Sequence, residues 1–279
     1  MNRSIALVLP YLKFPGGEFY QETIRGIDEY VEKYSFSILL ANFSERNSSF
    51  IRIVRENRVD GAIIIGDIFS NKELKKIDEL SLPIVIVNQK VNFKFKHIVD
   101  VYSDNITGAK LLTQHLIKIH NRNKILFLGG GVKYQTNNER IRGFKNVVEN
   151  SKVRYTILNG KFEEAPKSGY MIIKNLIKEK RFNFDAIICS SDTLAVGAIK
   201  ALIEDKIKVP EQVSVVGYDN IQITRFYPVS ITSVDPSAFL MGQIAGELLL
   251  KWITEKELPQ DIKVKVTPKL IIRESCGCK

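Results

Sequence analysis

Short runs of apolar, mostly β-branched residues alternate along this chain with longer stretches of helical periodicity. The runs at 5–9 and 84–87, for example, contain no polar residue. Unbroken apolar runs are typical of strands buried on both faces of a parallel sheet. After the first run, Tyr20, Ile24 and Ile27 recur at helical spacing. Repeated strand–helix units of this kind predict parallel sheets covered by helices on both faces, with right-handed crossovers.

The strand–helix units form two series, which predict two doubly wound α/β subdomains. The second series starts after Asp104. The predicted strands cover 5–9, 36–41, 62–65, 84–87, 124–128, 154–158, 186–189, 213–216 and about 262–272. The main predicted helices cover 71–80, 104–119, 137–149, 166–179, 192–204 and 236–252. Doubly wound sheets bind ligands at the carboxyl ends of their strands, so two facing subdomains predict a ligand cleft.

Composition narrows the class of protein. A length of 279 residues suggests about two domains, and 44% hydrophobic with 26% charged residues is ordinary for a globular protein. The net charge of +10 suggests a nucleic-acid partner. The lysines are scattered, however, and no helix-turn-helix, zinc finger or aromatic-basic motif accompanies them. We therefore expect a solvated basic surface.

The apolar runs also bear on location. None of them approaches the roughly 20 residues that a membrane-spanning helix needs. The short apolar run near Met1 does not have the length of a signal peptide. We therefore predict a cytoplasmic protein with no membrane contact.

Three cysteines make a disulfide framework improbable and fit a reducing compartment. The sequence Cys276-Gly277-Cys278 places two thiols together, but no histidine lies near them along the chain. His115 and His120 are five residues apart, which does not place them on one helical face. The sequence therefore predicts no metal site, because two thiols do not complete a tetrahedral ligand set.

The sequence matches no complete catalytic or cofactor-binding motif. Gly129 and Gly131 follow a predicted strand as in a dinucleotide-binding fingerprint, but Tyr134 occupies the third glycine position. A phosphate-binding Gly-Lys-Ser/Thr triplet and a nucleophile elbow are both missing. The sequence thus predicts a binding protein that is not an enzyme and needs no cofactor.

A series of motifs together resembles one known family. In chain order they are Ile24-Arg25-Gly26-Ile27, Asp60-Gly61-Ala62-Ile63, Ser103-Asp104-Asn105, Glu139-Arg140, Ser191-Asp192, Val213-Ser214-Val215-Val216-Gly217-Tyr218-Asp219-Asn220 and Leu270-Ile271-Ile272-Arg273-Glu274-Ser275-Cys276. Their order and spacing resemble LacI/GalR-type transcriptional regulators over essentially the whole chain.

The resemblance implies a periplasmic-binding-protein-like effector domain, in which three crossovers join two subdomains around a cleft. It places the N-terminal subdomain at 1–120 plus 235–261 and the C-terminal subdomain at 121–234 plus 262–279. A small effector, usually a sugar or nucleobase in this family, binds in the cleft and changes the subdomain orientation. The resemblance further implies a homodimer.

Regulators of this type read operator DNA with a helix-turn-helix headpiece of about 60 residues. Here the first predicted strand begins within a few residues of Met1. We therefore expect the operator contacts to belong to a headpiece that is absent from this chain.

Three aromatic residues match ligand-facing positions of the family. Phe19 and Tyr20 follow the first predicted strand, and Phe162 follows the strand at 154–158. Flat aromatic rings stack on the apolar face of a sugar or on a base. The alternative for Phe19 and Tyr20 is that they pack into the core beneath their own helix.

Polar residues at predicted helix starts form a second group of candidates. Asp104, Asn105 and Thr107 match ligand-facing positions, although Asp104 is equally suited to capping its helix. Ser191 stands where the family often has asparagine, and its side chain reaches less far. Asp192, the next residue, is expected to cap the helix that it begins.

Two charged residues are the strongest candidates. Arg140 matches the effector-binding arginine of the family, and its planar fork can hold two hydroxyls or a carboxylate. Asp219 follows the strand at 213–216, and its carboxylate can accept hydrogen bonds from two vicinal hydroxyls. Together they favour a sugar as the effector.

Two other functions remain open on the sequence alone. The same fold serves sugar-binding proteins of transport systems, which need a secretion signal. It also serves sensor domains fused to an output other than a DNA-binding headpiece.

Overall fold

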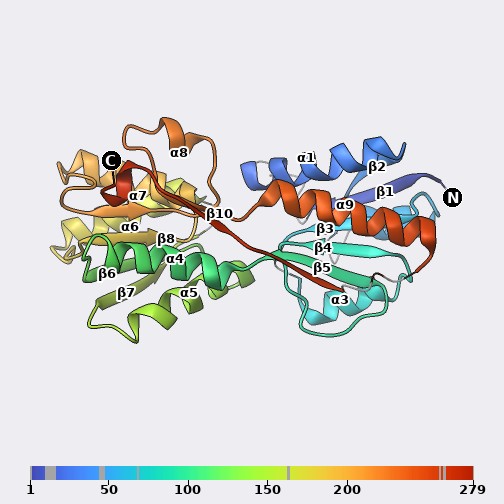
Figure 1. The fold of residues 1–279 in the computed structure, drawn as a ribbon, viewed down its shortest axis with the longest axis horizontal. Coiled ribbons are helices and arrows are strands. Elements are labelled where there is room, and N and C mark those ends of the chain that lie inside the picture. Colours follow the sequence, from blue (N-terminus) through green and yellow to red (C-terminus); the bar gives the residue numbers. More distant parts are fainter. Residues whose placement is uncertain are drawn as a thin grey trace. The chain divides into compact units, whose positions relative to one another are not determined.

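The computed structural model describes residues 2–9, 17–43, 48–67, 69–161, 164–257, 259 and 262–278. The chain divides into two compact units (Figure 1). Unit 1 comprises Met1–Ser103 with Ser237–Val266, and unit 2 comprises Asp104–Pro236 with Thr267–Lys279. Each unit is a parallel sheet with helices on both faces, as the strand–helix alternation predicted. Within the described ranges, no helix combines the length and the apolar character needed to cross a membrane.

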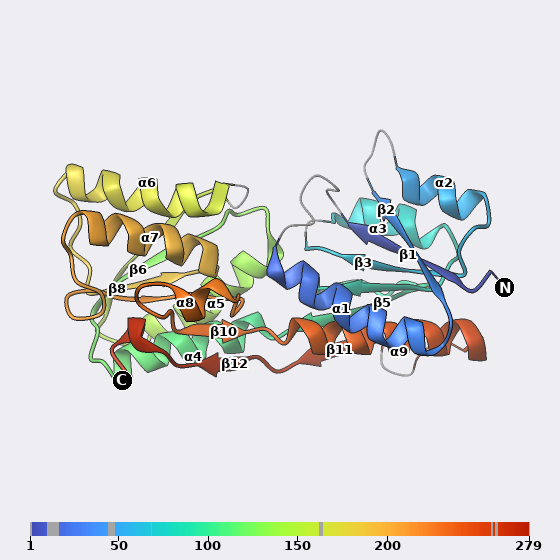
Figure 2. The ribbon, with the colours of Figure 1, turned by 90° about the horizontal axis from the view of Figure 1, so that it is seen from above.

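Unit 1 is built on a six-stranded sheet in the order β11-β5-β4-β3-β1-β2, in which all neighbours are parallel. The strands are β1 (Ser4–Leu9), β2 (Ser37–Asn42), β3 (Gly61–Ile65), β4 (Ile84–Val87), β5 (Ile98–Ser103) and β11 (Lys263–Val266). The helices are α1 (Glu18–Lys33), α2 (Ser49–Arg55), α3 (Asn71–Asp78) and α9 (Ala238–Glu255). Helices α1 and α9 cover one face of the sheet, and α2 and α3 cover the other (Figure 2).

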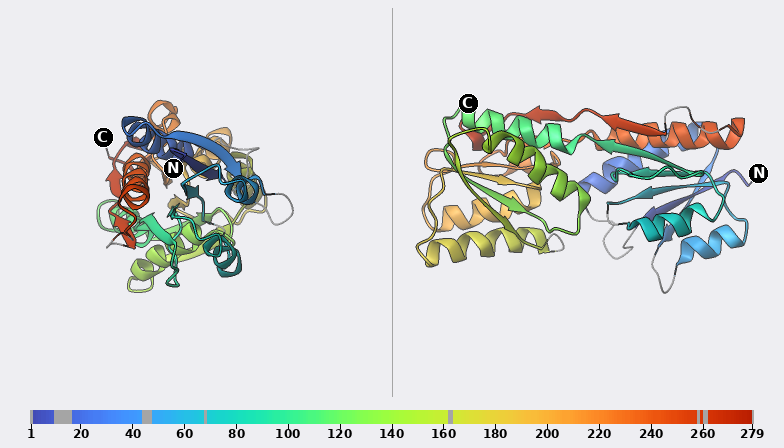
Figure 3. Two further views of the ribbon diagram at one scale, coloured as in Figure 1. Left: turned by 90° about the vertical axis from the view of Figure 1, so that its right-hand side faces the viewer. Right: turned by 90° about the horizontal axis from the view of Figure 1, so that it is seen from below.

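Unit 2 is built on a four-stranded parallel sheet in the order β7-β6-β8-β9. Its strands are β6 (Lys124–Gly129), β7 (Arg154–Asn159), β8 (Ala186–Cys189) and β9 (Ser214–Val216); β10 (Ser233–Asp235) and β12 (Lys269–Ile271) form a separate antiparallel pair. Helices α4 (Asn105–Lys118) and α5 (Gln135–Val148) cover one face, and α6 (Ala165–Lys178) and α7 (Asp192–Glu204) cover the other (Figure 3). A short helix α8 (Ile223–Phe226) and a 3-10 turn η2 (Glu274–Cys276) complete the unit.

The first predicted boundary between the subdomains, at residue 120, is wrong because helix α4 belongs to unit 2. A Cβ atom added at Gly143 of α5 would lie 2.3 Å from the Ile106 carbonyl oxygen of α4. The two helices therefore meet backbone against backbone. Leu112 and Leu116 of α4 also join the unit 2 core, in which Phe144 of α5 is buried. The boundary lies instead between Ser103 and Asp104.

The last predicted boundary between the subdomains, at residue 261, is also wrong. The single strand predicted at about 262–272 is two strands in different units. Strand β11 pairs in parallel with β5 of unit 1, whereas β12 pairs antiparallel with β10 of unit 2. Pro268 separates them, and proline cannot donate the hydrogen bond that a continuing ladder needs. The boundary lies between Val266 and Thr267.

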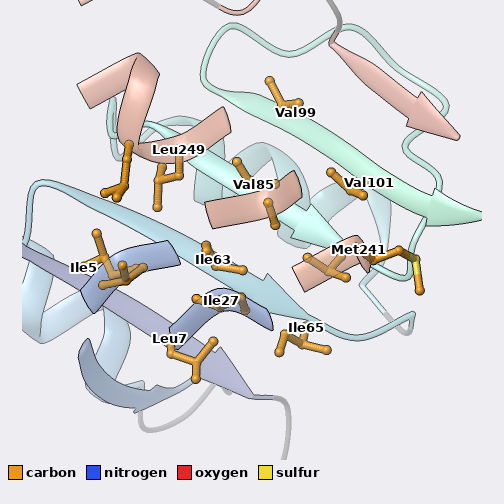
Figure 4. Packing of buried hydrophobic residues seen from close by; sticks show 14 of the residues in the cluster. Ile5, Leu7, Ile27, Ile63, Ile65, Val85, Val99, Val101, Met241 and Leu249 are labelled. Carbon is orange, nitrogen blue, oxygen red and sulfur yellow. The ribbon is translucent and has the colours of Figure 1, made fainter. Parts of the chain in front are cut away.

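The core of unit 1 shows why unbroken apolar runs predict buried strands. In β3, Ile63 and Ile65 face α1 and α9, and Ile64 faces α2 and α3. All three side chains are fully buried. Figure 4 shows Ile63 and Ile65 packed among residues of β1, β4, α1 and α9. Because successive side chains of a strand point to opposite faces, a strand with helices on both faces must be apolar throughout.

Candidate functional site

The polar candidates gather at the carboxyl edge of the unit 2 sheet. Ser190, Ser191 and Asp192 come directly after β8, and Asp219 follows β9. Parallel neighbours bring these strand ends to one edge. Asp192 is fully buried and Ser191 is only 1% exposed. The sheet edge therefore carries a buried polar cluster, where α/β sheets place their ligand sites.

Arg140, on α5, is the centre of this cluster. Its side chain is buried, and its Nε donates a hydrogen bond of 3.0 Å to Asn105 Oδ1. One terminal nitrogen donates to the carbonyl oxygen of Ser190, and the other lies 3.3 Å from Asp219 Oδ1 in an ion pair. These contacts account for three of the five N–H donors of the guanidinium. The two remaining donors sit on a group that is already fixed in place.

Tyr218 fixes the plane of that guanidinium. Arg140 Cζ lies 3.6 Å from the centroid of the Tyr218 ring, a stacked cation–π contact. Tyr218 is itself 1% exposed, and burial raises the pKa of its hydroxyl above the ordinary value. A Cβ atom at Gly108 of α4 would lie 2.3 Å from the Tyr218 hydroxyl oxygen. Only glycine at 108 leaves room for the ring that supports Arg140.

Asp219 holds an unusual backbone conformation. Its φ is +105°, and that of Asn220 is +52°. Positive φ is costly for residues other than glycine and persists only where the surroundings enforce it. Here Asp219 N donates to Val234 O at 2.8 Å, and Arg273 donates to Asn220 Oδ1 at 2.6 Å. The turn after β9 is therefore locked so that the Asp219 carboxylate meets Arg140.

Asp192 is a second carboxyl group beside this turn. Its Oδ2 accepts the N–H of Ile221 at 3.0 Å, and its Oδ1 accepts the Ser233 hydroxyl at 2.7 Å. Burial raises the pKa of Asp192 well above its ordinary value, and the nearby charge of Asp219 adds to that shift. Its buried contacts join the start of α7 to the turn after β9 and to strand β10, so we assign it to positioning the turn that carries Asp219.

The residues at the start of α4 have different roles: Asp104 caps the helix, and Asn105 belongs to the Arg140 cluster. Asp104 is the N-cap, since its Oδ1 accepts the N–H of Thr107 at 3.0 Å. Asn105 is 2% exposed, and its Nδ2 donates to Glu139 at 3.1 Å while its Oδ1 accepts from Arg140. Thr107 is half-buried. Asn105 thus extends the cluster into the chain Glu139–Asn105–Arg140–Asp219.

The capping role expected of Asp192 belongs to Ser191. Ser191, not Asp192, is the N-cap of α7, because its Oγ accepts the N–H of Leu194 at 3.3 Å. Ser191 Oγ also lies 3.0 Å from Thr193 Oγ1. The prediction that Asp192 caps this helix is therefore wrong: its carboxylate turns toward Ile221 and Ser233 instead.

The aromatic candidates do not join this cluster. Phe19 and Tyr20 lie in the first turn of α1, in unit 1, with their rings edge to face at 5.7 Å. Both are half-buried and pack against the apolar core of that unit. This placement agrees with the packing alternative, and their role toward a ligand stays a prediction. Phe162 lies outside the described residues.

Sequence reasoning missed three parts of this site, namely Tyr218, Glu139 and the Ser190 carbonyl. The family motifs contain Tyr218 and Glu139 but assign neither of them a role. The signal for Tyr218 was present, since an aromatic residue between Gly217 and Asp219 directly follows a strand. Ser190 contacts Arg140 through its backbone carbonyl. Every residue has such a carbonyl, so the residue type gives no signal of this contact.

The spacing of the histidines and cysteines along the chain predicted no metal site, but the fold brings these four residues together. His115 and His120 lie beside Cys276 and Cys278, with all four ligand atoms within 4.8 Å of one another. His115 and His120 are five residues apart, and this spacing alone does not place both side chains on one face of a helix. The turn after α4 brings the two rings together, with Nε2 atoms 3.2 Å apart.

Comparison with known proteins identifies a family. Residues 113–276 match the periplasmic binding protein-like domain. The HTH-type transcriptional repressor PurR from Haemophilus influenzae is 29% identical over 98% of this chain and 81% of its own length. The ribose operon repressor of Halalkalibacterium halodurans is 28% identical over 97% of this chain and 78% of its own length.

Solved structures show the same fold. A LacI family transcriptional regulator from Enterococcus faecium, with bound ribose, superposes with a TM-score of 0.82 at 24% identity. The match covers 98% of both chains. The curated relatives are transcriptional repressors rather than enzymes.

Proposed function

Because this chain belongs to the periplasmic binding protein-like family and is the effector-binding domain of a LacI-type regulator, we propose that it binds a sugar through Arg140 and Asp219. The observation that supports this most is the fixed guanidinium of Arg140. Three of its donors are bound within the protein, and its plane is stacked on Tyr218. A group held in this way loses little entropy when a ligand arrives.

The charges of this pair suit a neutral polyol. Asp219 is 16% exposed, so its carboxylate remains partly accessible beside a buried guanidinium. A sugar hydroxyl can donate to the carboxylate while its neighbour accepts from Arg140, and both hydrogen bonds are charge-assisted. An anionic ligand would meet the charge of Asp219 as well as that of Arg140. The paired charges therefore favour a sugar over an acid.

We further propose that the sugar controls DNA binding by shifting the equilibrium between two conformations. A ligand can do so only by its difference in affinity for the two states. The homodimer and the helix-turn-helix contact with operator DNA, through a segment outside this chain, are part of the same proposal. The DNA contact is supported by the names of the curated relatives, which are repressors, and the homodimer rests on the family resemblance alone.

A ligand screen tests the proposal. A sugar that binds the folded state raises the melting temperature by mass action, so a thermal-shift panel of pentoses, hexoses, disaccharides and nucleobases identifies candidates. Titration calorimetry on a hit then compares the wild type with Arg140→Lys, which keeps the charge but loses the planar fork. We expect the affinity to fall about 30-fold, because roughly 2 kcal/mol of fixed hydrogen bonding is lost.

The matched control is Arg142→Lys, an exposed position on the same helix, which we expect to leave the affinity unchanged. Phe19→Ala, measured with the same ligand, tests the predicted aromatic contact. Unchanged affinity in both Arg140→Lys and Asp219→Asn would place the site elsewhere. A panel in which only nucleobases bind would overturn the sugar assignment and leave the regulator domain intact.

A further inference from the structure

Four side chains with metal-binding atoms, none of them part of the Arg140 cluster, converge at one end of unit 2. His115 lies in the last turn of α4, and His120 lies just beyond that helix. Cys276 ends the 3-10 turn η2, and Cys278 follows two residues later. Figure 3 shows the C-terminus beside the end of α4. Each residue contributes one ligand atom, and these atoms all lie within 4.8 Å of one another.

Four of the six separations between the ligand atoms are those of a tetrahedral zinc site, and the other two are within 4.8 Å. Zinc–nitrogen and zinc–sulfur bonds of ordinary length require edges of about 3.3 Å between two nitrogens and about 3.5 Å between nitrogen and sulfur. The two histidine Nε2 atoms are 3.2 Å apart. Cys276 Sγ lies 3.4 Å from His115 Nε2, while Cys278 Sγ lies 3.6 Å from His115 Nε2 and 3.4 Å from His120 Nε2.

We propose that His115, His120, Cys276 and Cys278 bind one zinc ion in a closed, structural Cys2His2 site. Thiolate and imidazole ligands select zinc over the harder cations magnesium and calcium. Four protein ligands leave no open position for a water or substrate, so the site has no catalytic role. Its effect is to fasten the C-terminal segment of the chain to the end of α4.

The backbone around the two thiols is shaped for this arrangement. Gly277 has a φ of +109°, which reverses the chain between the cysteines at little cost. A Cβ atom there would lie 3.1 Å from His120 Nδ1, so a larger residue would press on a proposed ligand. The positive φ thus favours glycine at this turn, and the close imidazole ring favours it further.

Hydrogen bonds hold the two ligand-bearing segments in register before any metal arrives. Ser214 Oγ donates to the carbonyl oxygen of Cys276 at 2.7 Å. The same hydroxyl accepts from Arg122 Nε at 3.0 Å, and Arg122 is two residues from His120. Ser275 is anchored as well, through its hydroxyl bond to the Val215 carbonyl. Strand β9 thus positions one ligand segment against the other.

The proposal is tested on the whole protein, purified in a thiol reductant without added chelator. We expect one zinc per chain by elemental analysis. After exchange, we expect Co²⁺ to give the visible bands of a tetrahedral ion together with thiolate-to-cobalt charge transfer. Cys278→Ser and His120→Asn lie at half-buried positions, so they should fold and yet lose most of the metal. The matched controls are Cys189→Ala and His97→Asn, which should keep one equivalent.

Stability gives a second measurement. Because the metal binds only the folded site, removing zinc with a chelator should lower the melting temperature by roughly 5–10 °C, and added zinc should restore it. The same treatment should leave the melting temperature of Cys278→Ser unchanged. Wild-type protein that holds no zinc, gives a Co²⁺ spectrum without thiolate bands, or carries a disulfide between Cys276 and Cys278 would overturn the proposal.

Discussion

Units 1 and 2 share one architecture and differ in what they bury. In unit 1, β3 and β4 are apolar along their whole length, and the buried polar residues two positions beyond them, Asp67 and Gln89, belong to no described cluster around a buried arginine. In unit 2, β8 is equally apolar but leads at once into buried Ser190, Ser191 and Asp192, beside buried Arg140. A doubly wound sheet supplies the same scaffold to both. Ligand chemistry is added where buried polar groups are tied together at the carboxyl edge.

The difference has an energetic consequence. Apolar packing, which dominates unit 1, is non-directional and insensitive to pH. The Arg140 cluster of unit 2 depends on every partner being present, because a buried charge left unpaired is strongly destabilising. Substitutions should therefore separate scaffold residues, whose loss costs stability alone, from cluster residues, whose loss also costs ligand affinity.

The largest effect is expected in the shared scaffold. Ile63 of β3 and Ile187 of β8 are both fully buried, each between two neighbouring strands. Ile63→Ala and Ile187→Ala should each lower the free energy of unfolding by about 4 kcal/mol, from lost burial plus the remaining cavity. Urea denaturation measures both. A loss under about 1 kcal/mol in only one of them would show that the two scaffolds are not equivalent.

A smaller effect concerns a buried carboxyl group in unit 1, that of Asp100 in β5. It is 2% exposed, and burial raises its pKa to about 6, although its oxygen accepts the N–H of Val91 at 3.1 Å. The folded state therefore binds a proton more tightly than the unfolded chain. The wild type should lose stability as the pH rises from about 4 to about 6, and the full penalty is present above that range.

Asp100→Asn removes this titration and keeps an acceptor for Val91. At pH 7 the variant should be more stable than the wild type by about 3 kcal/mol, and the advantage should vanish near pH 4. Denaturation curves across that range measure it, with exposed Asp28→Asn as the control. A constant difference at every pH would contradict the role of Asp100 ionisation.

The smallest effect distinguishes a cap from a ligand contact. Ser191 caps α7 in unit 2, and Ser48 caps α2 in unit 1, where its Oγ accepts the N–H of Ile51 at 3.2 Å. Each Ser→Ala variant should cost about 1 kcal/mol of stability. If Ser191 only caps, its variant should leave the affinity for a sugar hit unchanged. A tenfold loss of affinity would instead support the ligand contact that the family resemblance implies.

Most of the elements followed from the apolar periodicity, but β5 did not. Its sequence, Ile-Val-Asp-Val-Tyr-Ser, puts a carboxylate in the middle of a buried strand. An isolated carboxylate there would be costly. It is tolerated because Val91 donates to it and Lys263 and Lys90 lie near it. Strand β10 was missed as well, because three residues paired with β12 give no local signal.

For the candidate site, the family motifs predicted Asn105, Arg140 and Asp219, and the fold brings all three into contact. They did not predict that Ser191 is a cap or that Tyr218 supports Arg140. Those roles depend on which atoms the folded chain brings into contact with Ser191 and with Arg140. The spacing of residues along the chain does not determine these contacts.

By itself, the sequence determined the class of fold and the residues that a parallel sheet must bury. Both follow from short-range periodicity, since a strand or a helix imposes its own repeat on the apolar positions. The tertiary structure alone decided that α4 belongs to unit 2 and that the predicted last strand divides. It alone placed His115 and His120 beside Cys276 and Cys278, more than 150 residues further along the chain. Contacts between distant segments are set by how the elements pack together, and local periodicity carries no record of them.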